Sequence, residues 1–532
     1  MESFKQLRAQ LGRAWALNKP GVGVDHVLVV LPSFSVGESL LSHYASRIPA
    51  LEHRYLVTHL LLHRIEACEL VFLTCQAPGQ EILDYYTSLV PADRRASVRA
   101  RFRLVVVPDD TPRAIAAKLL DRPDLLAALR TSFGDRPVFI GPWNVTDREV
   151  EVAVALQAPI DGTAPHLWAL GYKSAGRRLF AEAGVPVPVG REDVRTVEEV
   201  VAAINAVRSA RPTALGVVVK LDNSGAGDGN VVIDLRQVGG GPAAAEQLLG
   251  RVASLPEWYL RDLAGGGVVE ELVAGARFAS PSVQLDVSPS GEVAVLSTHE
   301  QLLGGETGQV YVGCRFPADP AYAGELACHG RAIGNRLAAR GVVGRLSVDF
   351  AAAGDGAGRW RVFALEVNLR KGGTTHPFVV LRNLVPGRYH AESGRWVAAD
   401  GSARWYWSTD NLVDPAWLGL SPATVIKAVA DAGLQFDHRT GTGVVLHMLS
   451  CLAIDGRFGL TAIGRTPEQA AELYHATRSA VDGHANPAGR GGGDGQATDR
   501  PACRRNEYAR CGVCRTRSMP RWAWAITPAR FG

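Results

Sequence analysis

The sequence predicts a chain of mixed α/β and α+β class, with a Rossmann-like N-terminal unit, a strand-rich central unit and a small C-terminal α+β unit. Three observations lead to this prediction. Apolar runs alternate with helical patterns over the first 165 or so residues, strand patterns dominate residues 213–369, and both kinds mix over residues 387–482. A chain of 532 residues is too long to fold around a single hydrophobic core, so we expect roughly two to four domains.

The N-terminal unit is predicted from four apolar runs, HVLVVLPSF, ACELVFLTC, RFRLVVVP and RPVFIGPW, separated by helical patterns such as RAIAAKLLDRPDLLAALR. This alternation is typical of a parallel sheet flanked by helices. The next segment, residues 171–190 (GYKSAGRRLFAEAGVPVPVG), indicates a helix that Gly184 and Pro186 end.

Strand patterns follow in ALGVVVKLDNS, NVVIDL, GVVEELV, SVQLDVS, EVAVLST, VVGRLSVDF and RWRVFALEVNL. One long helix, AYAGELACHGRAIGNRLAARG, interrupts them. In the C-terminal unit we expect strands in VVLHMLSCLAI and FGLTAIG and a helix in PEQAAELYHATRSAV.

The composition, 47% apolar and 21% charged, is that of an ordinary soluble globular protein. No apolar run approaches the roughly 20 residues that cross a bilayer, and the first residues lack the apolar core of a signal peptide. We therefore expect no membrane association and a cytoplasmic protein. The eight scattered cysteines do not suggest a disulfide framework.

The net charge of +4 comes from the C-terminal segment, because residues 485–532 hold nine Arg against three acids and residues 1–484 carry −2. The body thus offers no electrostatic footprint for nucleic acid, and binding through the arginine-rich segment is the weakest hypothesis. That segment is rich in Gly and Arg, so we predict disorder. Its C-x2-C and one further cysteine fall short of a four-ligand zinc site.

The run ALEVNLRKGGTTHPF predicts a metal cradle. On a strand, Glu366 and Asn368 point to one face and Val367 to the other, so two oxygen ligands lie side by side for a hard cation such as Mg²⁺. Asp349, on what should be an adjacent strand, supplies a third ligand. Arg345 and Arg370 flank this set as candidates for neutralising phosphate or acyl-phosphate charge, although a surface salt bridge would explain either one singly.

The glycine-rich stretch SGAGDGN is followed by the strand NVVIDL rather than by a helix, which excludes a dinucleotide fingerprint. It indicates a β-hairpin whose glycine tip lets backbone N–H groups approach phosphates. Lys220, at the end of the entering strand, would aim an ammonium at the same anion, but a plain glycine-rich hairpin stays open. The sequence contains no GxxxxGK[ST] phosphate loop.

The run VVEELVAG would offer alternate backbone C=O and N–H groups to an adenine edge, with Glu270 or Glu271 nearby. An ordinary strand end with solvated acids is the open alternative. No Ser, Cys or His nucleophile has supporting partners at a suitable spacing.

The order of these elements resembles the ATP-grasp superfamily of carboxylate-amine ligases. Longer phrases, such as LPSFSVGES, PIDGTAPHLWALGYKSAGRRLFAEAGVPVP, THEQLLGG and EVNLRKGGTTHPF, resemble the pheganomycin-type peptide ligases of actinobacteria over residues 26–482. The resemblance implies a pre-ATP-grasp domain at 1–168, an ATP-grasp domain at 169–386 and a small C-terminal domain at 387–484, with the tail at 485–532.

The resemblance also implies roles for individual residues. Lys220 would contact phosphate, and a second cation on the preceding helix, Arg177 or Lys173, would do the same; the choice between them stays open. No acid stands where the family often binds ribose, since the chain reads GARF with Arg277 there. The other assignments are a phosphate flap at Ser224, Gly225, Gly227 and Gly229, an adenine linker at Glu270, Glu271, Leu272 and Val273, and metal ligands at Asp349, Glu366 and Asn368.

The implied reaction uses ATP with Mg²⁺ or Mn²⁺ to convert a carboxylate into an acyl phosphate, which an amine attacks to give an amide, ADP and phosphate. The substrates would be the carboxylate and amine of amino acids or peptides, in natural-product biosynthesis. The acceptor loop would hold Gly372, Thr374, Thr375 and His376, and the acyl site His299 and Gln301; a structural role stays open for both histidines. A non-catalytic ATP-binding partner protein is the alternative, and a homo-oligomer stays open.

Overall fold

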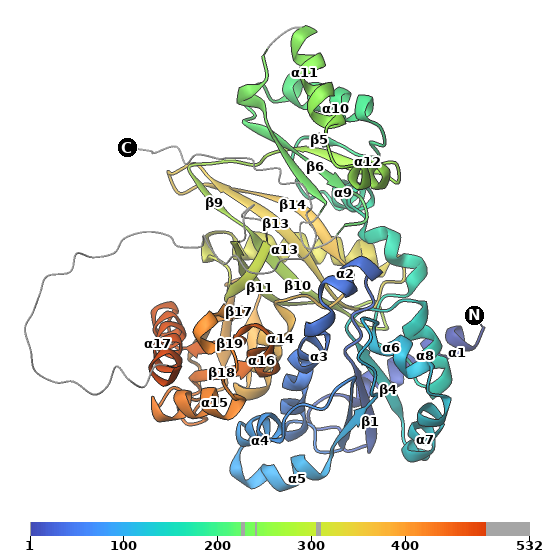
Figure 1. The fold of residues 1–532 in the computed structure, drawn as a ribbon, viewed down its shortest axis with the longest axis vertical. Coiled ribbons are helices and arrows are strands. Elements are labelled where there is room, and N and C mark those ends of the chain that lie inside the picture. The colour runs from blue at the N-terminus through green and yellow to red at the C-terminus, as the bar shows by residue number, and fades with distance from the viewer. Residues whose placement is uncertain (1, 225–228, 240–241, 305–309, 486–532) are drawn as a thin grey trace, which may run out of the picture. The chain divides into compact units, whose positions relative to one another are not determined.

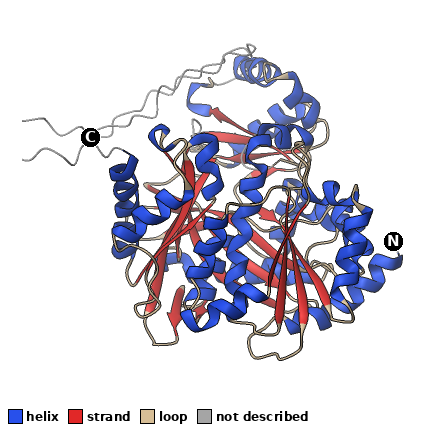
Figure 2. Ribbon diagram, turned by 60° about the horizontal axis from the view of Figure 1, so that its bottom comes forward, coloured by secondary structure: helices blue, strands red, loops and turns tan. Residues whose placement is uncertain are grey.

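The computed structural model describes residues 2–224, 229–239, 242–304 and 310–485. The predicted disordered segment and its C-x2-C pair lie outside the described residues, as do Gly225 and Gly227 of the predicted flap. Helices and strands follow one another along the whole described chain (Figure 1) and pack as layers of sheet and helix (Figure 2). Among the described residues, every helix is too short or too polar to span a bilayer.

The N-terminal unit is a four-stranded parallel sheet in the order β3-β2-β1-β4. Its strands are the four predicted apolar runs: β1 (His26–Leu31), β2 (Cys68–Thr74), β3 (Phe102–Val106) and β4 (Val138–Pro142). Side chains of β1 alternate between two cores, with Val27 and Val29 on one face and Leu28 and Val30 on the other. This confirms the Rossmann-like prediction, since both faces of the sheet are apolar.

Helices cover both faces of this sheet (Figure 1). One core receives α6 (Ile115–Leu120), α7 (Pro123–Phe133) and α8 (Asp147–Leu156), and the other receives η2 (Arg54–His63), α4 (Gln80–Ser88) and α5 (Arg95–Ala100). The remaining helical segments of this unit are α1 (Glu2–Leu17), α2 (Glu38–His43), η1 (Ala45–Arg47), α3 (Ile48–His53), η3 (Ala92–Arg94) and η4 (Pro165–Gly171).

The predicted helix after this unit is α9 (Lys173–Glu182). It ends before Gly184, whose φ of +68° reverses the chain as the sequence indicates. A four-stranded antiparallel sheet follows in the order β5-β8-β6-β7. It comprises β5 (Gly190–Arg191), β6 (Gly216–Leu221), β7 (Asn230–Asp234) and β8 (Gly267–Glu271), with α10 (Val197–Ala210), η5 (Leu235–Gln237), α11 (Pro242–Ala253) and α12 (Glu257–Leu263).

The third sheet has eleven strands, and its main path runs β14-β13-β10-β11-β12-β17-β16-β15. The strands of its first half are β9 (Arg277–Ala279), β10 (Pro281–Val287), β11 (Val293–Gly304), β12 (Val310–Phe316), β13 (Gly344–Gly354) and β14 (Trp360–Asn368). Val283, Val348 and Val367 point into a core shared with α9 and α13 (Pro320–Ala338), the predicted long helix. The opposite face of these strands is therefore free to carry polar side chains.

The C-terminal strands continue this sheet, because β17 pairs with β12 on one side and with β19 on the other. The elements are β15 (Gly387–His390), β16 (Arg395–Ala398), β17 (Ala403–Val413), η6 (Pro415–Trp417), α15 (Pro422–Asp431), β18 (Gly443–His447), η7 (Leu449–Cys451), α16 (Leu452–Asp455), β19 (Arg457–Gly464) and α17 (Pro467–Ala485). The predicted strand VVLHMLSCLAI stops at His447 and turns helical. The domain boundaries stay a prediction.

One local expectation is wrong. Thr375 and His376 do not lie in a loop but open helix α14 (Thr375–Leu384), with Thr374 at the N-cap position. The helix forms because Phe378, Leu381 and Leu384 recur at helical spacing and pack into the core beside β12 and β17. The loop after β14 is therefore only a few residues long.

Candidate active site

The polar face of β13 and β14 brings the predicted metal ligands together. Asp349 pairs with Glu366 in the sheet register, and Ser347 pairs with Asn368. The amide of Asn368 donates to Asp349 Oδ2 over 3.0 Å, and Gln301 of β11 donates to Oδ1 over 2.8 Å. Asp349, Glu366, Asn368 and Gln301 thus form one cluster, while Val367 lies in the core as strand alternation predicts.

Two neighbouring carboxylates make this cluster electrostatically costly without a cation. Burial, and next the charge of Glu366, raise the pKa of Asp349 to about 7. A divalent cation would relieve both effects, and the donor set of two carboxylates and an amide oxygen is the hard-oxygen type that Mg²⁺ prefers. The residues therefore fit the Mg²⁺ that the sequence resemblance implies.

Cations border the same carboxylates. Lys173 Nζ lies 3.8 Å from Glu366 Oε2 and donates to the backbone carbonyl of Ser224 over 2.7 Å, at the start of the predicted flap. Arg370 lies 5.1 Å over the ring of Trp143. Burial lowers the pKa of Arg370, and the carboxylates of Glu366 and Asp349 oppose that shift.

Arg177 makes different contacts from Lys173, although the two share one face of α9. Its guanidinium donates to Glu270 over 2.6 Å, to Glu192 over 2.7 Å and to the carbonyl of Pro188 over 3.0 Å. Lys220 Nζ contacts the other carboxylate oxygen of Glu270. Glu270 is 2% exposed, and burial alone would raise the pKa of its carboxyl group. The charges of Lys220 and Arg177 outweigh burial and hold that pKa below its ordinary value.

Two residues of the predicted adenine linker form hydrogen bonds within the protein. Glu271 ends β8 and accepts from the backbone N–H of Val189 over 3.0 Å, and Leu272 donates its N–H to the carbonyl of Gly216 over 2.8 Å. Val273 follows as a half-buried residue. In the described part of the flap, Ser224 donates to the carbonyl of Leu221, and Gly229 is the residue before β7.

Sequence reasoning missed a group of charged residues beside Arg345. Lys371 and Arg382 are half-buried and make no hydrogen bond or ion pair with any described side chain. Burial lowers the pKa of Lys371 to about 8 although the charge of Asp161 opposes the shift, and burial and Arg345 lower that of Arg382 to about 10. Asp161 and Asp286 are the acids that face these cations.

These three cations outnumber the two acids, and their polar atoms are poorly paired. Arg345 Nε is 3.8 Å from Asp286 Oδ1, and Arg345 Nη1 and Asp161 Oδ1 have no hydrogen-bond partner among the described residues. The unpaired guanidinium nitrogen of Arg345 and the excess of cations over acids together suit an anion. The run RK after the metal strand was the available signal for Lys371, whereas Arg382 and Asp161 come from distant segments.

The predicted acyl-site and acceptor residues do not all lie together: Gly372 and Thr375 form a turn, whereas both predicted histidines are buried. Gly372 donates its N–H to Thr375 Oγ1 over 3.0 Å, which forms a tight turn before α14. His376 is buried and lies 2.9 Å from Asp410. His299 donates to or accepts from the hydroxyl of Tyr406 at 2.6 Å and packs on Phe316, so its contacts are with the aromatic core rather than with Asp349.

Family models match two parts of the chain. One described as "IQCH-like, ATP-grasp" matches residues 253–375, and one described as "PGM1 C-terminal domain" matches residues 424–477. The chain is 34% identical over 429 residues to an L-propargylglycine–L-glutamate ligase of Streptantibioticus cattleyicolor, which covers 78% of this chain and 86% of that protein. It is 24% identical over 343 residues to IQ motif-containing protein H of Danio rerio, which covers 54% of this chain and 32% of that protein.

Among solved structures, the chain is similar to the biotin carboxylase domain of Hydrogenobacter thermophilus 2-oxoglutarate carboxylase, in complex with MgADP, ADP and bicarbonate. The TM-score is 0.51 at 13% identity, over 85% of this chain and 89% of that one. An ADP complex of N5-carboxyaminoimidazole ribonucleotide synthetase gives 0.48 at 13% identity, over 88% and 98%. The first of these structures agrees with this chain in fold. The 34% identity to the curated ligase over most of both chains, together with the ATP-grasp family model, shows that this chain belongs to the ATP-grasp superfamily and, within it, to the pheganomycin-type peptide ligases, which use ATP and Mg²⁺ to form an amide bond.

Proposed function

We propose that this ligase joins the carboxylate of one amino acid or short peptide to the amine of an amino acid that carries its own free carboxylate. The observation that carries the proposal is that this chain has both the acid-amide cluster at Asp349 and an excess of cations at Lys371 and Arg382. The named substrates of the Streptantibioticus cattleyicolor relative, L-propargylglycine and L-glutamate, are of this class. The product would belong to a peptide natural product.

Asp349, Glu366 and Asn368 would hold the divalent cation, which screens the phosphate charges of ATP when bound. Lys173 is directed to the same side by its contacts with Glu366 and the Ser224 carbonyl, and would bind phosphate. Glu270 orients Lys220 for the same purpose. In this proposal Arg177 holds Glu270 in place and does not contact ATP, while Arg277 leaves the ribose site unassigned.

Arg370 and Arg345 would neutralise charge on the acyl phosphate, from which the acyl group passes to the amine while phosphate leaves. Such a reaction depends on positioning and charge, so it requires no nucleophilic side chain. The turn from Gly372 to Thr375 would contact the acceptor, and Lys371 and Arg382 would bind its carboxylate. Gln301 would orient Asp349, and His299 would support the aromatic core.

The test is an ATP-dependent ligation screen of amino acids and dipeptides, read by ADP release and by product mass. We expect Glu366→Gln to reduce ADP release by roughly 100-fold or more, because one of the two metal carboxylates loses its charge. Glu325→Gln, at an acid that is 46% exposed on α13, is the matched control and should keep full activity.

Equal turnover by Glu366→Gln and the wild type would contradict the assignment of the metal cluster. ATP binding without any product from the complete substrate panel would instead support the non-catalytic alternative. We do not favour that alternative, because the metal ligands and both flanking arginines are all present.

A further inference from the structure

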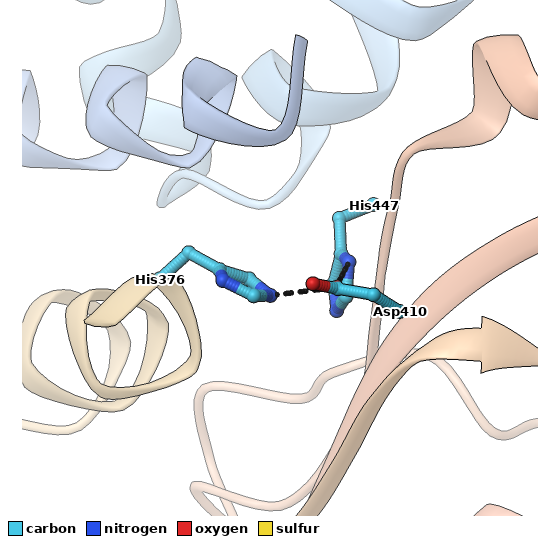
Figure 3. Close-up of side chains that lie close together, drawn as sticks. All are labelled: His376, Asp410 and His447. Carbon is cyan, nitrogen blue, oxygen red and sulfur yellow. Dashed lines mark ion pairs between the residues drawn. The ribbon is translucent and has the colours of Figure 1, made fainter. Parts of the chain in front are cut away.

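Three ionisable side chains converge where helix α14 meets strands β17 and β18 (Figure 3). His376 comes from α14, Asp410 from β17 and His447 from the end of β18, so segments far apart in the sequence meet here. His376 is 1% exposed, Asp410 7% and His447 0%. Burial this deep makes the polar atoms of the cluster costly unless each has a partner.

The facing atoms are close together but are not hydrogen-bonded. His376 Nε2 is 2.9 Å and His447 Nδ1 is 3.2 Å from Asp410 Oδ1, and all three atoms lie within 4.8 Å of one another. Nevertheless none of the three atoms has a partner in hydrogen-bond geometry among the described residues. Figure 3 shows that both imidazoles face the same carboxylate oxygen of Asp410.

The two separations at Asp410 are compatible with a tetrahedral metal centre. Bonds of about 2.0 Å to a tetrahedral ion place neighbouring ligand atoms about 3.3 Å apart, close to the two separations at Asp410. Two imidazoles and one carboxylate are typical of Zn²⁺ and similar first-row divalent ions. Mg²⁺ prefers oxygen ligands only, so this cluster differs in chemistry from the acid-amide cluster at Asp349.

The surroundings supply the outer contacts that metal ligands commonly have. His447 Nε2 lies 3.4 Å from the hydroxyl of Thr461, which would fix Nδ1 as the free nitrogen. Arg54 of η2 donates to Asp410 Oδ2 over 2.8 Å and leaves Oδ1 free. A metal-free cluster, in which Arg54 alone neutralises Asp410, is the competing description, but it leaves the three converging atoms unsatisfied.

We propose that His376 Nε2, Asp410 Oδ1 and His447 Nδ1 bind one first-row divalent ion of the Zn²⁺ class, with water in the fourth position. The ion would join α14 to β17 and β18. It would also fix the start of α14, where Thr375 accepts from Gly372 in the turn beside the acid-amide cluster. This proposal does not depend on which substrates the ligase uses.

The experiment measures bound metal in the full chain, purified without added metal and kept in Mg²⁺ and ADP. We expect about one Zn²⁺ per chain, or stoichiometric binding when Zn²⁺ is titrated against a chromophoric competitor. Replacement by Co²⁺ should give visible ligand-field bands of a nitrogen-oxygen site without thiolate charge transfer. His447→Gln should weaken Zn²⁺ binding at least about tenfold and remove those bands.

Two controls make the result decisive. His299→Gln changes another fully buried histidine and should keep the metal, and Cys511→Ser with Cys514→Ser tests the C-terminal cysteines as the source of binding. Wild-type protein that takes up neither Zn²⁺ nor Co²⁺ would overturn the proposal, as would binding that only the cysteine variant removes. If His447→Gln fails to fold, the Co²⁺ spectrum of the wild type still decides between nitrogen-oxygen and thiolate ligands.

Discussion

The side chain of Lys371 lies in a setting where its charge depends on pH near neutrality. Burial brings its pKa down to about 8, below the ordinary value of a lysine, so the ammonium deprotonates as pH rises through that value. We expect the KM for the acceptor to rise about tenfold between about pH 7 and about pH 9, since only the charged form attracts a carboxylate. Steady-state kinetics over this range, at saturating ATP, would measure it.

Lys371→Arg is the informative variant, because an arginine stays charged over the whole range. It should flatten the pH profile of KM and leave that of kcat unchanged. Lys371→Met should raise KM at every pH. An unchanged profile in Lys371→Arg would mean that another group governs binding of the acceptor.

Glu52 gives a second residue-scale prediction, concerning stability. Its carboxylate is 1% exposed and accepts from Thr74 Oγ1 at 2.8 Å and from the backbone N–H of Cys75 at 2.7 Å, while Oε1 has no partner among the described residues. Burial raises its pKa to about 7 in spite of these bonds. The folded protein therefore holds a proton that the unfolded chain releases near pH 4.

Because the folded state binds the extra proton between about pH 4 and about pH 7, the free energy of unfolding falls as pH rises through that window. Glu52→Gln lacks this effect. As the pH is raised from about 4 to about 8, the free energy of unfolding of the variant should rise by about 3 kcal/mol relative to that of the wild type. Urea denaturation at both pH values measures the difference, and parallel curves for the two proteins would contradict it.

At the scale of elements, Arg177 connects α9 to β8. It is 4% exposed at its side chain, and removing it leaves the buried carboxylate of Glu270 with Lys220 alone. We expect Arg177→Met to cost about 3 kcal/mol or more, since it uncovers a buried charge. Arg178→Ala is the matched control: the neighbouring arginine is 52% exposed, and its loss should stay within about 0.5 kcal/mol.

The double variant Arg177→Met with Glu270→Gln should recover part of the loss, because it removes both partners. Urea midpoints of the four proteins give the comparison. A destabilisation of Arg177→Met no larger than that of Arg178→Ala would show that the buried pair does not hold these elements together.

Strand alternation was sufficient to predict the placement of Glu366, Val367 and Asn368, because a period of two is a local property of the chain. The different contacts of Lys173 and Arg177 were not predictable, since both residues lie on one face of α9 and only their distant partners differ. Lys371 and Arg382 were missed for the same reason. Their significance comes from Asp161 and Asp286, which the fold brings from other elements.

At the scale of the whole molecule, periodicity predicted the types of most elements but not how the sheets join. The order β11-β12-β17-β19 depends on the pairing of β12 with β17, in which Cys314 pairs with Ser408 although the two lie far apart in the sequence. No local pattern encodes such a partner. The C-terminal unit therefore looks separate in the sequence, although its strands extend the sheet that carries the acid-amide cluster.

This continuity predicts how the chain responds to truncation. A chain that ends at Pro386 loses β17, the partner of β12, and with it Tyr406, which stacks on Phe316 at 4.8 Å and bonds to His299. The exposed edge and apolar surface should make it aggregate or lose cooperative unfolding. A chain that ends at Ala485 keeps every described strand and should unfold cooperatively, as judged by circular dichroism and light scattering. Because the eleven strands share one sheet, a soluble, cooperatively folded chain ending at Pro386 would contradict this prediction and indicate that the first half of the sheet is stable without its C-terminal strands.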